Sequence, residues 1–205
     1  MGPAPDLGCP GCGAADAHGL ACQTCLNLGS PLSQLLSFYQ YESITFQKVL
    51  RAYKERGLRL VLPHVLSRLT DVNEHLSVEQ ETAVVPIPAS KKRLQQLGWN
   101  HTLPVASHLA GVLGCCLADK ALVLSQRSKS GASAAQKTRS IQERRLALKD
   151  TFMWQGRGSI SPTVILVDDV TTTLATLETA AQTCLDAGAK RVIGVVLAHT
   201  ALTSG

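Results

Sequence analysis

The chain has 205 residues, of which 45% are hydrophobic and 17% charged, a composition that excludes wholesale disorder and allows a packed core. The formal net charge of +5 suits ligands that carry phosphate, whereas the 4% aromatic content leaves few side chains for stacking bases. No apolar stretch reaches the ~18 residues of a membrane span, and the N-terminus lacks the basic and apolar regions of a signal peptide. We therefore expect a cytoplasmic protein without membrane insertion.

The N-terminal segment contains two C-x2-C pairs, formed by Cys9, Cys12, Cys22 and Cys25. Each pair can place two thiolates on one ion from a tight turn, and two pairs complete a closed tetrahedral site. Cytoplasmic thiols bind metal more often than they form disulfides. We therefore predict a structural zinc ribbon over residues 1–30, with two disulfides or four unrelated thiols as the alternatives.

After a linker at residues 26–34, apolar strands and helix-like segments alternate along one predicted domain, residues 31–205, of which residues 31–80 form an entry or hood segment. Predicted strands lie at residues 35–41, 82–88, 120–125, 163–169 and 190–199. Predicted helices lie at residues 43–57, 58–69, 93–114 with breaks at Gly98 and Pro104, the later part of 130–152, and 176–188.

The predicted strands are apolar on both faces and are separated by helices. This combination predicts an α/β fold: a mostly parallel sheet with helices on both faces. Ligands of such sheets bind beyond the carboxyl ends of the strands. The three segments that follow strands, residues 89–93, 125–136 and 168–176, are therefore the candidate site loops.

The loop after Asp168 and Asp169 joins a buried strand to a helix. Its amides, the helix N-terminus and the hydroxyls of successive threonines can bind a phosphate monoester. The two aspartates can accept hydrogen bonds from a vicinal diol or hold Mg²⁺ through water. Diol and phosphate together describe a ribose 5-phosphate, and the alternative is an ordinary strand end with capping residues.

The stretch VILVDDVTTTLATL, residues 164–177, resembles the phosphoribosyl pyrophosphate (PRPP) signature of type I phosphoribosyltransferases. The wider chain resembles one branch of that superfamily, the ComF (ComFC/GntX-like) competence proteins. The shared motifs occur in the family's order and cover nearly the whole chain. They are the four cysteines, a K-x-x-G at Lys54 to Gly57, VVPIPASKKRLQQLGWN at residues 84–100, QKTRSIQERRLALKDTF at residues 136–152, and the PRPP stretch.

The resemblance implies a type I phosphoribosyltransferase-like fold that binds PRPP together with Mg²⁺. It assigns the ribose hydroxyls to Asp168 and Asp169, and the leaving pyrophosphate to Arg127 and Arg144 near a mobile catalytic loop. The other implied PRPP contacts are Thr172, Thr173, Leu174, Ala175 and Thr176 for the 5-phosphate, and Ser90, Lys91, Lys92 and Arg93 for the pyrophosphate. For the basic residues, a solvated helix face is the alternative interpretation.

Three residues depart from the family pattern: Leu174 replaces the glycine of the PRPP loop, Leu97 an arginine and Ala147 an asparagine. A leucine forced into the left-handed conformation costs ~1–2 kcal/mol, whereas a negative φ would cost little. Three functions stay open for this chain. They are PRPP-dependent transfer to an unknown acceptor, handling of single-stranded DNA in natural transformation, and a catalytically degenerate scaffold that docks proteins of the DNA-uptake machinery.

Overall fold

The computed structural model describes Cys9 and residues 29–41, 43–56, 62–67, 69–76, 78, 81–125, 151–171 and 174–199. Of the predicted zinc ribbon it therefore covers Cys9 and the last two residues, and of the predicted loop at residues 125–136 only Ser125. Within these ranges, no helix is long and apolar enough to cross a membrane.

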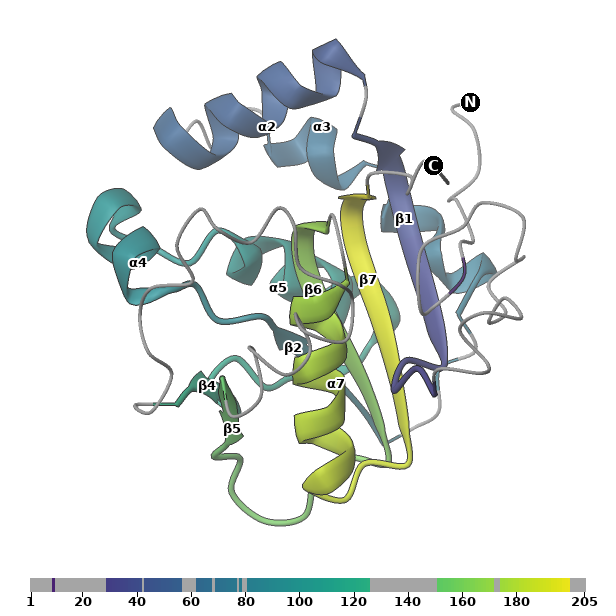
Figure 1. Cartoon of the computed structure of the whole chain (residues 1–205). Helices are drawn as coiled ribbons and strands as arrows, with labels where there is room; N and C mark the ends of the chain where they lie inside the picture. The colour runs from purple at the N-terminus through teal and green to yellow at the C-terminus, as the bar shows by residue number, and fades with distance from the viewer. Residues whose placement is uncertain are drawn as a thin grey trace.

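A five-stranded, all-parallel sheet forms the centre of the described structure (Figure 1). Its strand order is β1 (Gln34–Gln40), β7 (Arg191–His199), β6 (Thr163–Thr171), β2 (Thr82–Pro86) and β3 (Cys116–Leu117). The central strands β6 and β7 pair from Thr163 opposite Arg191 to Thr171 opposite His199. These apolar strands are covered on both faces, as a parallel sheet requires.

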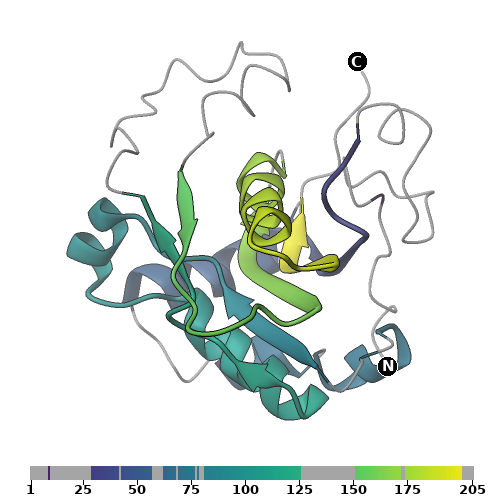
Figure 2. The same ribbon diagram turned by 90° about the horizontal axis from the view of Figure 1, so that it is seen from below.

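Helices pack on both faces of the sheet, as Figure 2 shows in a view turned by 90° from that of Figure 1. On one face lie α2 (Ile44–Arg56), α3 (Leu62–Leu66), the 3-10 helix η3 (Leu69–Glu74) and α5 (Thr102–Leu113). On the other face lie α7 (Ala175–Asp186) and a hairpin of β4 (Leu122–Leu124) and β5 (Phe152–Trp154). The predicted α/β class, with a parallel sheet and helices on both faces, is confirmed.

Strand β6 contributes side chains to the hydrophobic cores on both faces of the sheet. Val164 and Leu166 pack into the core under α7, whereas Ile165 and Val167 pack into the core under α2 and α5. All four side chains are fully buried. Successive residues of a strand point to opposite faces, so an unbroken apolar run is the pattern that a strand buried on both sides needs.

Several predicted elements differ from the structure. In place of the helix predicted at residues 58–69, the described residues 62–67 and 69 contain the short α3 and the start of η3. Pro104 does not break α5: it lies in the first turn, where a missing N–H removes no intrahelical hydrogen bond. Gly98 does end α4 (Lys91–Leu97), in a left-handed conformation.

The predicted strand at residues 120–125 is also placed differently. Its counterpart β4 lies outside the main sheet and pairs antiparallel with β5. Strand β5 includes Phe152, where the sequence predicted the end of a basic helix, and β3 was not predicted at all. Strands of two or three residues carry too little periodicity to be recognised in a sequence.

Candidate functional site

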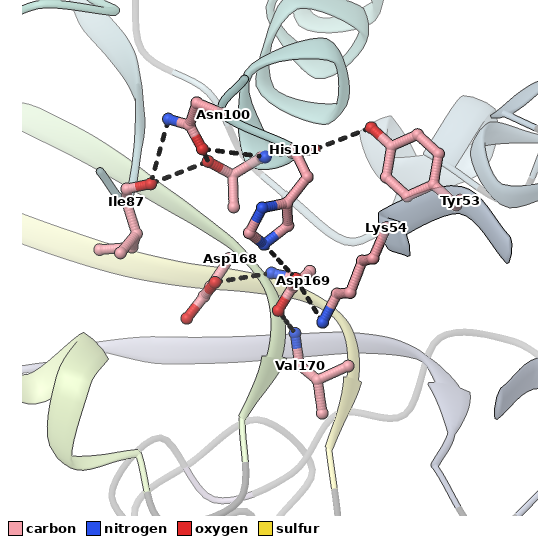
Figure 3. A network of polar contacts seen from close by, with 9 residues as sticks. Tyr53, Lys54, Ile87, Asn100, His101, Asp168, Asp169 and Val170 are labelled. Carbon is pink, nitrogen blue, oxygen red and sulfur yellow. Dashed lines mark hydrogen bonds and ion pairs between the residues drawn. The ribbon is translucent and has the colours of Figure 1, made fainter. Parts of the chain in front are cut away.

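Three parts of the chain meet at the carboxyl end of β6 (Figure 3). Strand β6 supplies Asp168 and Asp169, the last turns of α2 supply Tyr53 and Lys54, and the turn before α5 supplies His101. The carboxyl edge of a parallel sheet is the usual place for a ligand site in this class of fold. The predicted position of the site at this edge therefore agrees with where these polar groups gather.

Asp169 lies on the α2 and α5 face of the sheet and its side chain is only 2% exposed. One carboxylate oxygen, Oδ2, contacts Nζ of Lys54 at 2.5 Å and also contacts Nε2 of His101. The other oxygen accepts a hydrogen bond from the amide of Val170. Burial by itself would raise the pKa of Asp169, but the contact with His101 and the charge of Lys54 outweigh it and hold this pKa below its ordinary value.

Asp168 points away from that cluster, as expected for neighbouring residues of a strand (Figure 3). Its Oδ1 accepts a hydrogen bond of 2.8 Å from the amide of Asp169, and no described residue pairs with its Oδ2. The side chain is partly exposed. Burial and the negative charge of Asp169 raise the pKa of Asp168, while the positive charges of Lys54 and Arg93 act against the rise. Among the described residues, Asp168 is therefore the aspartate of the pair with an unpartnered oxygen.

The turn before α5 is fixed to the neighbouring elements by hydrogen bonds. The hydroxyl of Tyr53 donates to the backbone carbonyl of His101 at 2.8 Å, which ties α2 to this turn. Asn100 accepts from the amide of Thr102 at 3.2 Å, and both side chains reach the carbonyl of Ile87, at 3.4 and 2.8 Å. The backbone of Ile87 continues the pairing of β2 with β6, so the turn is held against the sheet.

The loop after β6 contains Leu174, the departure from the PRPP signature. Its φ of 55° lies in the left-handed region, and it is the only such residue other than glycine in the described chain. Its amide donates to Oγ1 of Thr171 at 3.0 Å, and its side chain is 3% exposed in the core that Leu177 of α7 also joins. Of the two conformations that the sequence allowed, the structure has the strained one, accompanied by a well-buried side chain.

The remaining residues predicted for the 5-phosphate divide into two groups. Ala175 is buried and Thr176 is exposed, both in the first turn of α7. Thr172 and Thr173 lie outside the described residues. The structure thus describes Leu174, Ala175 and Thr176 next to the end of β6, and it leaves the two central threonine hydroxyls of the predicted cradle as a prediction.

The predicted pyrophosphate loop follows β2 and opens α4. Ser90 is the N-cap of this helix, and its hydroxyl accepts from the amide of Arg93 at 3.2 Å. Lys91, Lys92 and Arg93 are exposed, and no residue of α4 is buried. Among these three cations, the charge of Arg93 acts on Asp168. The solvated helix start and a ligand-facing cation are therefore both compatible with this loop.

The other predicted site residues fall in segments without a description. Arg127 and Arg144, assigned to the leaving group, lie outside the described residues. So do all the proposed zinc ligands except Cys9, which is buried. The fit of the cysteines to Zn²⁺ stays a prediction for this reason. Mg²⁺ is usually held by one or two carboxylates plus the phosphates of a substrate, and the free oxygen of Asp168 suits that arrangement.

Three residues of the site were not predicted as site residues: Tyr53, Lys54 and His101. The sequence places Lys54 only as the first residue of the K-x-x-G motif, although a lysine near a helix end can reach the sheet beneath. His101 offered no signal, because a single histidine after an Asn is compatible with many surface turns. All three became visible only when the fold brought α2 and the turn before α5 onto β6.

Comparison with known proteins gives the chain no family: it matches no protein-family model and no curated protein.

Proposed function

We propose that the chain is a ComF-type protein with a type I phosphoribosyltransferase-like domain, that it binds PRPP with Mg²⁺ at the carboxyl edge of β6, and that it acts in natural transformation on single-stranded DNA. The proposal takes its ligand from the resemblance of residues 164–177 to the PRPP signature. The observation that carries it is Asp168: a partly exposed carboxylate whose second oxygen has no partner among the described residues, at the edge where folds of this class bind ligands.

The surroundings of Asp168 support a ligand that combines a diol with phosphate groups. A free carboxylate oxygen accepts hydrogen bonds from ribose hydroxyls. The first turn of α4 presents Lys91, Lys92 and Arg93 to solvent nearby, with the charge of Arg93 felt at Asp168. Cations at this place would hold the pyrophosphate of PRPP. The helix start after Leu174 would face the 5-phosphate.

If the protein is an enzyme, its reaction needs no nucleophile from the chain. The acceptor forms a bond to C1 of the ribose, and pyrophosphate leaves with the bonding electrons. Mg²⁺, when bound, would neutralise the leaving pyrophosphate, and the task of the chain's own residues is to orient ribose and pyrophosphate and to stabilise charge. With a base as the acceptor, the reaction would belong to nucleotide salvage.

A catalytically degenerate scaffold that docks DNA-uptake proteins is the second candidate. The observation that favours it is Leu174, which occupies a left-handed position with its side chain buried. A glycine at this position would let a phosphate approach the backbone more closely. A protein that keeps the fold but binds PRPP weakly would tolerate the leucine.

Calorimetric titration with Mg-PRPP tests the proposal. We expect saturable heat for the unaltered protein, loss of binding for Asp168→Asn, and no change for Asp119→Asn, which alters an exposed carboxylate in the turn before β4. Leu174→Gly should bind Mg-PRPP more tightly. The absence of heat with the unaltered protein would refute PRPP binding, and equal affinity of Leu174→Gly would refute the weakening role of the leucine.

Release of pyrophosphate from bound Mg-PRPP separates enzyme from scaffold. For an enzyme we expect release in the presence of a suitable base acceptor, and for the scaffold we expect binding without release. Co-precipitation of DNA-uptake proteins that is lost when Cys9 and Cys12 are replaced by serine would support docking through the ribbon.

A further inference from the structure

The two aspartates of β6 differ in what surrounds them. Both oxygens of Asp169 are engaged, by Lys54, His101 and the amide of Val170, and its side chain is 2% exposed. Asp168 is partly exposed and keeps one oxygen without a partner among the described residues. A ligand can pair with the second oxygen of Asp168, whereas a ligand at Asp169 would have to displace Lys54 or His101 from its carboxylate.

A continuous set of contacts runs from α2 and α5 to Asp168 (Figure 3). Lys54 and His101 hold the side chain of Asp169 from two different elements. The backbone amide of the same residue donates to Oδ1 of Asp168 at 2.8 Å. Fixing Asp169 therefore fixes the donor that orients the partly exposed carboxylate of Asp168.

The two elements that supply Lys54 and His101 are also tied to each other. Tyr53, the neighbour of Lys54, donates its hydroxyl to the carbonyl of His101 at 2.8 Å and packs against Trp99 edge to face. Tyr53 itself is fully buried. The position of Lys54 relative to His101 is thus set by contacts that do not involve Asp169.

Stability alone is a weak reason for such a cluster. Charges taken out of water lose hydration, and apolar side chains of similar size often replace a buried ion pair without loss of stability. The Nδ1 atom of His101 is buried as well, and no described residue forms a hydrogen bond with it. A buried cluster with an unsatisfied atom is better explained by a geometric task than by its contribution to folding.

We propose that Lys54 and His101 are positioning residues: they hold Asp169 as a buried charge that is not itself a ligand group, and through its backbone amide they orient Asp168 toward the ligand. The inference rests on the proposed function for the identity of the ligand. It divides the roles of two aspartates that the sequence resemblance assigns jointly to the ribose hydroxyls.

The experiment combines thermal unfolding without ligand and calorimetric titration with Mg-PRPP, on the full chain. Lys54→Met removes the charge and keeps the length of the side chain. We expect its melting temperature to fall by about 6–12 °C, because it leaves a buried carboxylate without its cation. We expect its affinity for Mg-PRPP to fall about tenfold or more, and Lys54→Arg to restore most of it.

Two controls separate positioning from stability. Leu50→Ala removes a buried side chain of the same helix that is not part of the polar cluster, so it should lower the melting temperature to a similar degree and leave the affinity within about twofold. Lys48→Met removes an exposed charge of α2 and should change neither quantity. An equal loss of affinity in Leu50→Ala and Lys54→Met would overturn the positioning role.

A double-mutant cycle tests the anchor independently of any ligand. The side chains of Lys54 and Asp169 contact each other. The loss of melting temperature in the double variant Lys54→Met, Asp169→Asn should therefore be smaller than the sum of the losses in the two single variants. If Asp169→Asn does not fold, Lys54→Met with His101→Gln forms the cycle. Strictly additive losses would overturn the anchor. Absence of Mg-PRPP binding by the unaltered protein would instead refute the proposed function, and with it the assignment of Asp168 to that ligand.

Discussion

Replacing Leu174 with alanine and with glycine should reveal how much strain the loop after β6 contains. The residue has a φ of 55° and a side chain that is 3% exposed. Truncation to alanine removes a buried leucine side chain, which costs about 2–5 kcal/mol of unfolding free energy, but it leaves a Cβ in the left-handed conformation. Glycine removes that remaining conflict, which is worth ~1–2 kcal/mol.

Leu177 supplies the matched comparison, because it is fully buried in the same core and lies in regular helix α7. At Leu177, glycine should be less stable than alanine by about 1 kcal/mol, as in other helix interiors. At Leu174, the relief of strain should cancel or reverse this difference. The step from alanine to glycine should therefore be more favourable at Leu174 than at Leu177 by about 1–2 kcal/mol.

Urea unfolding of the four variants, followed by circular dichroism, measures these differences. The comparison subtracts the extra entropy of glycine in the unfolded chain, since that contribution is common to both positions. The step from alanine to glycine also removes one buried methyl group at each position, and most of this loss cancels in the comparison. An equal step from alanine to glycine at the two positions would refute the strained conformation of Leu174, and with it the reason for expecting Leu174→Gly to bind Mg-PRPP more tightly.

Three further predictions concern charge, metal and nucleic acid. The pKa of Asp168, raised to about 7 by burial and by Asp169, means that the folded chain keeps a proton that the unfolded chain loses above about pH 4. The free energy of unfolding should thus fall from pH 4 to pH 7 in the unaltered protein relative to Asp168→Asn, and parallel urea curves for the two proteins would contradict this. Elemental analysis should find one zinc ion per chain, and clearly less in Cys9→Ser; equal zinc contents would contradict the ribbon. Fluorescence anisotropy with a labelled single-stranded oligonucleotide should show affinity falling with salt, and replacing Lys91, Lys92 and Arg93 by glutamine should reduce the slope of log affinity against log salt by about 2; an unchanged slope would remove α4 from the binding surface.

The layered fold was predictable because its core strands are long and apolar. The strand predicted at residues 163–169 and the helix predicted at 176–188 correspond to β6 and α7 with small changes at their ends. The alternation of buried strands with helices was enough to predict a parallel sheet covered on both faces. A strand was predicted at residues 120–125, where β4 lies, but its pairing with β5 was not, because β5 has only three residues and follows a long intervening segment.

The candidate site was predictable in its position but not in its contacts. The DD pair at a strand end indicated the carboxyl edge, and the structure has both residues there. Lys54 and His101 lie more than sixty positions before Asp169 in the chain, and only tertiary packing brings them to it. Local sequence contains no information on which cation will approach a given carboxylate, because that depends on how α2 and α5 cross the sheet.

The strand period, applied to residues 164–169, already implies that two adjacent aspartates cannot face the same side of the sheet. The period does not tell which of the two carboxylates keeps an oxygen without a partner. The answer depends on the layers: α2 and α5 cover the face of Asp169, and a buried carboxylate can remain there as a charge only if it is paired, as Asp169 is with Lys54. Asp168, whose second oxygen has no partner among the described residues, is then the carboxylate of the pair that can meet a ligand without breaking the ion pair with Lys54. A pair of acidic residues in a strand of this kind therefore should be divided by face before either residue is assigned to a substrate.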